Sequence, residues 1–144
     1  MKQERNFKNY CIPFPNLKQI LFDLKRSNYK LGMITNGRGQ FQVKNIKALG
    51  VSAFFELILI SEIEGISKPN PKIFQKALDY FHVSANEAVY IGVHPDNDYK
   101  AARNLGMYAI WKQVLFYEDF EAENFVEDHS EIPKIIEKLS RRQL

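Results

Sequence analysis

Residues 89–107, which read VYIGVHPDNDYKAARNLGM, decide the fold. The β-branched and aromatic run 89–91 predicts a short strand, and the segment after the polar turn predicts a helix that ends at Gly106. The turn between them carries Asp96 and Asp98. Because open α/β sheets bind ligands at the carboxyl ends of their strands, we expect a functional loop at this point.

The segments on either side alternate between expected strands and expected helices. Strands are expected at 30–35, 57–60, 89–91 and 108–111, with a short one near 125–126. Helices are expected at 17–24, 41–49, 71–81 and 131–144, and another follows the turn that carries Asp98 and ends at Gly106. This order predicts an α/β fold, a three-layer Rossmann-like domain whose parallel sheet is covered on both faces. We expect a single domain over 1–144, irregular over 1–14.

Local signals set several helix ends and buried faces. Asn70 can cap a helix whose first residue is Pro71, and Gly50 and Gly106 are typical of helix ends. Apolar residues at helical spacing predict the buried faces of three helices: Leu17, Ile20, Leu21 and Leu24; Ile73, Phe74, Ala77, Leu78 and Phe81; and Ile132, Ile135, Ile136 and Leu139.

Composition bounds the class of protein. The 144 residues are 45% hydrophobic, enough for one domain with a real core. The net charge is only +3, and the lysines and arginines are interspersed with acidic residues, so we expect no nucleic-acid partner. No apolar run approaches the roughly 20 residues of a membrane span, and the single cysteine, Cys11, suits a reducing compartment. We therefore expect a soluble, cytoplasmic protein that does not enter a membrane.

Two further loops follow expected strands or helices and carry useful groups. The Thr35 hydroxyl, with the amides of Asn36 and Gly37, can cradle an anion, although Thr-Asn-Gly is also an ordinary turn. Lys68 precedes Pro69, which can stiffen the backbone and aim the ammonium into a site. An isolated lysine is more often a solvated surface charge.

The acidic loop admits several interpretations. Asp96 and Asp98 are oxygen ligands of the kind that Mg²⁺ prefers, and they are also common turn formers. For His94 we predict turn hydrogen bonding. A calcium loop is rejected because Ala101 stands where such a loop has glycine, and a dinucleotide fingerprint at 37–42 is poor because Gln42 replaces its third glycine.

Taken together, three segments strongly resemble the haloacid dehalogenase superfamily, most closely its mainly phosphatase branch with a small helical cap. The segments are MITNG at 33–37, SKPNPKIF at 67–74 and IGVHPDND at 91–98, followed by Gly106-Met107, and the resemblance covers about residues 15–111. It implies that Thr35 holds the transferred phosphoryl group, that Lys68 neutralises that group and the nucleophile, and that Asp98 helps to hold Mg²⁺. The expected substrate is a small phosphorylated molecule or inorganic phosphate.

Two positions depart from the family pattern. The family's nucleophile lies in an Asp-x-Asp-x-Thr or -Ser motif at the end of its first, central strand, and these 144 residues contain no such motif. Val93 stands where the family has an acid after the glycine of the last loop. We therefore expect a hydrolase truncated at its N-terminus, without the first strand and the cap, and catalytically impaired.

Other functions stay open beside this one. The chain can be a non-catalytic phosphate-binding, anion-binding or assembly module, one part of a split hydrolase, or a nucleotide-binding regulator. Its expected partner is then a second copy or a complementing N-terminal fragment. A missing central strand would leave buried backbone groups unpaired, so we expect the gap to be closed directly or plugged by residues 10–14.

Overall fold

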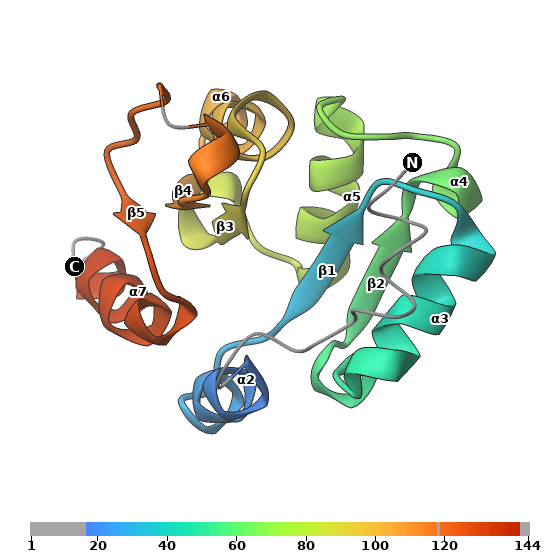
Figure 1. Cartoon of the computed structure of the whole chain (residues 1–144), viewed down its shortest axis with the longest axis horizontal. Helices are drawn as coiled ribbons and strands as arrows, with labels where there is room; N and C mark the ends of the chain where they lie inside the picture. Colours follow the sequence, from blue (N-terminus) through green and yellow to red (C-terminus); the bar gives the residue numbers. More distant parts are fainter. Residues whose placement is uncertain (1–16, 118, 142–144) are drawn as a thin grey trace. The chain divides into compact units, whose positions relative to one another are not determined.

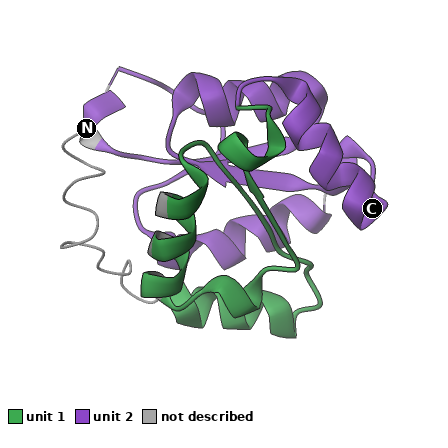
Figure 2. Ribbon diagram, turned by 90° about the vertical axis from the view of Figure 1, so that its right-hand side faces the viewer, with its two compact units in different colours: residues 1–67 green, residues 68–144 purple. Residues whose placement is uncertain are grey.

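The computed structural model of the chain describes residues 17–117 and 119–141, and the chain divides into two compact units. Unit 1 is Met1–Ser67 and unit 2 is Lys68–Leu144, coloured green and purple in Figure 2. The segment expected to be irregular, 1–14, and the expected plug, 10–14, lie outside the described residues. Both expectations, and that of a single domain, stay predictions.

Unit 1 contains a two-stranded parallel sheet (Figure 1). In its register Gly32 lies opposite Leu57 and Thr35 opposite Ile60, so the two strands end together. Its elements, in chain order, are α2 (Leu17–Arg26), β1 (Gly32–Thr35), α3 (Gly39–Leu49), η1 (Ser52–Phe54), β2 (Leu57–Ile60) and α4 (Ser61–Glu64).

A small apolar cluster holds unit 1 together. The predicted stripe of α2 is confirmed, because Ile20, Leu21 and Leu24 are all buried. Leu21 packs with Ile46 and Val51, and the sheet side chains Met33 and Ile58 lie against this cluster. Helix α3 ends as predicted at Gly50, whose φ of 68° is easily adopted without a side chain.

Unit 2 contains a three-stranded parallel sheet in the order β3-β4-β5 (Figure 1). Val89 lies opposite Tyr108, Gly92 opposite Trp111, and Trp111 opposite Phe125. Its elements are α5 (Pro71–Phe81), η2 (Ala85–Glu87), β3 (Val89–Gly92), η3 (Pro95–Lys100), α6 (Ala101–Leu105), β4 (Tyr108–Lys112), η4 (Leu115–Tyr117), β5 (Phe125–Val126), η5 (His129–Glu131) and α7 (Ile132–Arg141).

The helices of unit 2 begin and bury residues much as their sequences predict. The Asn70 side chain accepts a hydrogen bond from the Lys72 amide at 2.9 Å, which caps α5 with Pro71 in its first turn. Ile73 and Phe74 of α5 are fully buried. In α7 the buried face is Ile132, Ile136 and Leu139.

The α/β class and the parallel pairing are confirmed, and two details differ from expectation. The strands form two sheets, one in each unit, where one parallel sheet was expected. The helix expected after the acidic loop begins as a wide π-helical turn, η3, and only Ala101–Leu105 is regular helix. The wide turn arises because the His94 carbonyl accepts from the amides of both Asp98 and Tyr99. Among the described helices none is long and apolar enough to cross a membrane.

Candidate active site

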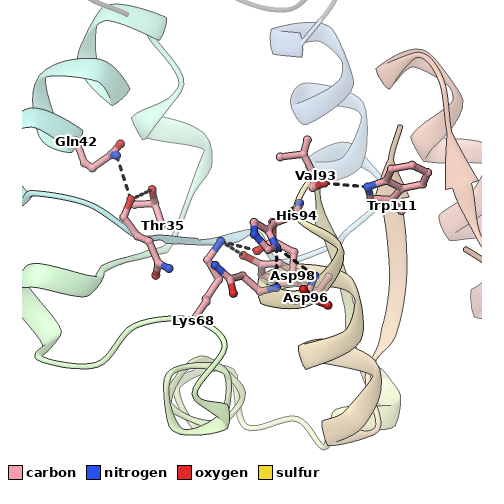
Figure 3. Close-up of polar contacts among 11 residues, drawn as sticks. Thr35, Gln42, Lys68, Val93, His94, Asp96, Asp98 and Trp111 are labelled. Atoms are coloured by element: carbon pink, nitrogen blue, oxygen red, sulfur yellow. Dashed lines mark hydrogen bonds and ion pairs between the residues drawn. The ribbon is translucent and has the colours of Figure 1, made fainter. Parts of the chain in front are cut away.

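A buried ion pair forms the centre of the site in unit 2 (Figure 3). The Lys68 ammonium lies 2.6 Å from Oδ1 of Asp98, and the two side chains are only 11% and 6% exposed. Lys68 lies before α5, and Asp98 lies in η3 beyond the carboxyl end of β3. The structure therefore brings together the predicted lysine and one of the two predicted metal ligands. A solvated surface lysine is excluded.

Asp98 is held in place by its own loop. Its second oxygen, Oδ2, accepts a hydrogen bond from the His94 amide at 3.1 Å. The side chain also lies directly against Gly92, where an added Cβ would come within 2.5 Å of Asp98. Glycine is needed at this position because the loop carboxylate and the strand backbone approach each other so closely.

Tyr90, on β3, is a site residue that the sequence analysis missed. Its hydroxyl accepts a hydrogen bond from Nζ of Lys68 at 3.1 Å, and the ammonium lies 5.6 Å from the ring centroid. Burial, and after it the charge and hydrogen bond of Asp98, raise the pKa of Tyr90 well above its ordinary value. One signal could have found it, since residues two apart on a strand share a face and Tyr90 is two residues from Gly92.

The rest of the loop is fixed by His94 and Trp111. Nδ1 of His94 accepts hydrogen bonds from the amides of Asp96 and Asn97 at 3.1 and 3.0 Å, which confirms the predicted turn role. Nε1 of Trp111 donates to the Val93 carbonyl at 2.8 Å, as drawn in Figure 3. The loop is thus tied both to itself and to β4.

The predicted magnesium ligands do not converge. Asp96 pairs with Lys100 at 3.2 Å, and its side chain is 68% exposed. Both oxygens of Asp98 already accept hydrogen bonds, from Lys68 and from the His94 amide. Within residues 17–117 and 119–141, no group of three or more His, Cys, Asp or Glu side chains is placed to hold a metal. These residues by themselves do not fit Mg²⁺, which prefers six oxygen ligands.

In unit 1 the turn after β1 is bound to the segment after β2. Oγ1 of Thr35 donates to the Asn36 carbonyl at 3.3 Å. The Gly37 amide, predicted to contact an anion, donates to Oγ of Ser61 at 2.9 Å, and Ser61 donates back to the Gly37 carbonyl at 3.3 Å. Ser61 therefore fixes this turn, and the sequence analysis missed it.

A carboxylate occupies the start of α3. Oε1 of Glu62 accepts a hydrogen bond from the Gly39 amide at 2.8 Å, where the helix dipole favours negative charge. Gln42 donates to the Asn36 carbonyl at 3.2 Å (Figure 3). The amides of Gly37 and Gly39 and the Gln42 side chain at this turn therefore already donate hydrogen bonds to oxygen atoms within unit 1.

The group in unit 2 that is best suited to bind a ligand is the Lys68 ammonium. A buried ammonium held by fixed partners can stabilise negative charge on a ligand without reorganising. Asp98 is poorly suited to act as a nucleophile because Lys68 and the His94 amide engage its two oxygens. The site can therefore bind and neutralise an anion, while covalent chemistry needs another group.

Comparison with known proteins gives a consistent family. The family model described as haloacid dehalogenase-like hydrolase matches residues 1–112. The chain is 36% identical to the glyceraldehyde 3-phosphate phosphatase of Pyrococcus furiosus over 92% of its own length and 56% of the relative's. It is 40% identical to the Pyrococcus abyssi phosphatase of the same name, over 71% of the chain and 43% of the relative.

Solved structures agree with these relatives. A haloacid dehalogenase-type phosphatase from Thermococcus onnurineus superimposes with a TM-score of 0.79 at 26% identity, covering 94% of this chain and 65% of that one. A 2-haloacid dehalogenase from Pseudomonas syringae gives 0.74 at 31% identity, covering 87% and 53%. The chain spans about half the length of the relatives that it matches in sequence. It belongs to the haloacid dehalogenase-like hydrolase family.

Proposed function

We propose that this chain is the phosphate-recognising part of a phosphatase-type hydrolase that acts on a small phosphorylated molecule in the cytoplasm. The buried Lys68–Asp98 pair carries this proposal, because it places a fixed positive charge beyond the carboxyl end of a parallel strand. The names of the relatives make glyceraldehyde 3-phosphate the first substrate to test.

Each residue has a separate role in this proposal. Lys68 neutralises the phosphoryl oxygens, and Asp98 holds Lys68 in place. In unit 1, Thr35 and the backbone of Asn36 and Gly37 are a separate candidate for binding an anion, as the family resemblance implies. Magnesium is an expectation of the family resemblance, and no step here depends on it.

We further propose that the isolated chain turns over little or no substrate. Covalent phosphoryl transfer needs a nucleophile, the expected Asp-x-Asp-x-Thr or -Ser motif is missing from these 144 residues, and Val93 replaces an acid. Losing both groups removes many powers of ten in rate. The test is release of phosphate from glyceraldehyde 3-phosphate and a generic phosphate ester, with and without Mg²⁺. A robust Mg²⁺-dependent rate that Asp98→Ala abolishes would overturn impairment.

Phosphate binding is tested separately from turnover. Inorganic phosphate should raise the melting temperature of the wild-type chain and leave that of Lys68→Gln nearly unchanged. Lys72→Gln is the matched control, since Lys72 is an exposed lysine on α5. Equal phosphate-induced shifts in wild type and Lys68→Gln would remove Lys68 from the binding site.

A second candidate is one part of a split hydrolase. The missing nucleophile motif favours it, because a second polypeptide carrying an Asp-x-Asp strand would supply what this chain lacks. The DNA directly upstream should then encode that motif, and mixing the two chains should restore Mg²⁺-dependent turnover. Retained phosphate binding with no such reading frame favours the non-catalytic module.

A further inference from the structure

Lys68 has a second fixed partner besides Asp98, the phenol of Tyr90. Nζ of Lys68 donates to the Tyr90 hydroxyl at 3.1 Å and to Oδ1 of Asp98 at 2.6 Å. Asp98 also lies near Tyr90, and its negative charge contributes to the raised pKa of the phenol. Lys68, Asp98 and Tyr90 therefore form one set of side chains, in which the ammonium is bonded to both of the others.

The tyrosine is the rigid member of this set. Its ring meets that of Phe74 edge-on, with centroids 5.0 Å apart and planes 77° apart, and Phe74 is fully buried. A tyrosine side chain has two rotatable bonds, whereas a lysine ammonium sits on a flexible four-carbon stem. Core packing thus fixes the Tyr90 hydroxyl, and the hydroxyl fixes the ammonium.

We propose that Tyr90 is a positioning residue, whose hydroxyl holds the Lys68 ammonium against Asp98 and sets where the site presents its positive charge. Two directed hydrogen bonds define the orientation of the ammonium, which a single ion pair does not. The claim that this ammonium binds a phosphate rests on the proposed function. The positioning itself rests only on the contacts within unit 2.

The alternative for Tyr90 is a purely structural role, in which only its ring matters. Tyr90→Phe separates the two, because it keeps the ring against Phe74 and deletes the hydroxyl. Tyr80→Phe is the matched control, since Tyr80 is a half-exposed tyrosine on α5. If only the Tyr90 ring matters, neither Tyr90→Phe nor Tyr80→Phe should change the reactivity of Lys68.

The readout is the rate at which an amine reagent, acetic anhydride, modifies each lysine, measured by mass spectrometry on the intact 144-residue chain. Lys72 serves as the exposed internal standard. Lys68 should react slowly in wild type, and Tyr90→Phe should raise its rate about tenfold, the equivalent of one hydrogen bond to a charged group. The rate at Lys72 should not change, and Tyr80→Phe should change neither rate.

The proposal is overturned if Tyr90→Phe leaves the Lys68 rate within about twofold of wild type, a change smaller than one hydrogen bond. Should Tyr90→Phe fail to fold, the wild-type chain still decides: nuclear Overhauser contacts between the Lys68 Hε protons and the Tyr90 ring support positioning, and their absence refutes it.

Phosphate titration keeps the two proposals distinguishable. If Lys68 labelling responds to Tyr90→Phe while phosphate leaves wild type unshifted, the positioning role stands and the phosphate site falls. If phosphate raises the melting temperature of wild type while Tyr90→Phe leaves the labelling rate of Lys68 unchanged, the phosphate site stands and the positioning role falls.

Discussion

At the scale of single residues, the site depends on close approaches that sequence spacing cannot reveal. Lys68 and Asp98 are 30 positions apart, and the sequence assigned them to different ligands, phosphate and Mg²⁺. Tyr90 and Ser61 were missed for the same reason, since their partners are brought to them by folding. His94 was predicted correctly because its partners, Asp96 and Asn97, are its near neighbours in the chain.

Lys68→Met should destabilise unit 2 by about 3–5 kcal/mol, because it leaves a buried carboxylate without its counter-charge. Adding Asp98→Asn should recover part of that loss, since an amide is neutral and its oxygen can still accept from the His94 amide. Urea unfolding of the single and double variants measures both values. A double variant less stable than Lys68→Met would contradict this account of the pair.

Gly92→Ala should cost about 1–3 kcal/mol, the range for an overpacked site. The new methyl group would lie 2.5 Å from Asp98, so the carboxylate or the strand must move. Gly65→Ala is a contrasting control, since an added Cβ there meets nothing within 4 Å, although its φ of 73° carries backbone strain. Weaker phosphate protection in Gly92→Ala alone would link the displacement to the site, and unaltered unfolding would show that the contact is easily relieved.

At the scale of elements, local chemistry decided what could be predicted. Asn70 and Pro71 start α5, and Gly50 ends α3, because capping depends on residues one to four positions apart. Residues 95–98 were expected to be a polar turn before a regular helix, but residues 95–100 form a π-helical turn, because the His94 carbonyl accepts hydrogen bonds from the amides of Asp98 and Tyr99. The spacing of apolar residues along a helix carries no information about hydrogen bonds of this kind.

The 3₁₀ turn η5 before α7 should make stability depend on pH. Burial lowers the pKa of His129 below its ordinary 6.5, the Lys112 charge lowers it further, and Asp128 opposes them. The folded chain therefore takes up this proton at lower pH than the unfolded chain. The stabilisation is complete above the ordinary value and is lost as pH falls through the lowered one.

Replacing His129 by asparagine tests this dependence. The melting temperature of wild type should fall more steeply than that of His129→Asn as the pH is lowered from about 7.5 to about 5, because only wild type must protonate a half-buried imidazole. Comparing the two chains cancels the carboxylates that titrate in both. Parallel curves would mean that His129 is as easily protonated in the folded chain as in the unfolded one.

At the scale of the whole molecule, the sequence specified the class of fold better than its assembly. Alternating strands and helices predicted parallel α/β architecture, which the two sheets confirm. That the strands divide between two units was not foreseen, because periodicity identifies strands without naming their neighbours. Partners, including a second copy or an N-terminal fragment, stay predictions for the same reason.

Adding about 5 mM Mg²⁺ should move the melting temperature of the isolated chain by less than about 1 °C, because a ligand stabilises only when its concentration exceeds its dissociation constant. Asp96 and Asp98 face different partners, so they offer no chelating pair. Differential scanning fluorimetry with Ca²⁺ as a comparison cation measures this. A saturable, Mg²⁺-specific rise that Asp98→Asn removes would restore the magnesium assignment.

The hydrogen bond between Trp111 and the Val93 carbonyl has a practical consequence. Trp111 is the only tryptophan in the chain and is 2% exposed, so the tryptophan fluorescence of the protein, excited where its tyrosines do not absorb, comes from one indole bonded to the acidic loop. The emission wavelength of this indole depends on its hydrogen bond and on the polarity of its surroundings. The chain therefore carries its own optical probe, and a spectral shift on adding an anion would show movement of the loop without any label.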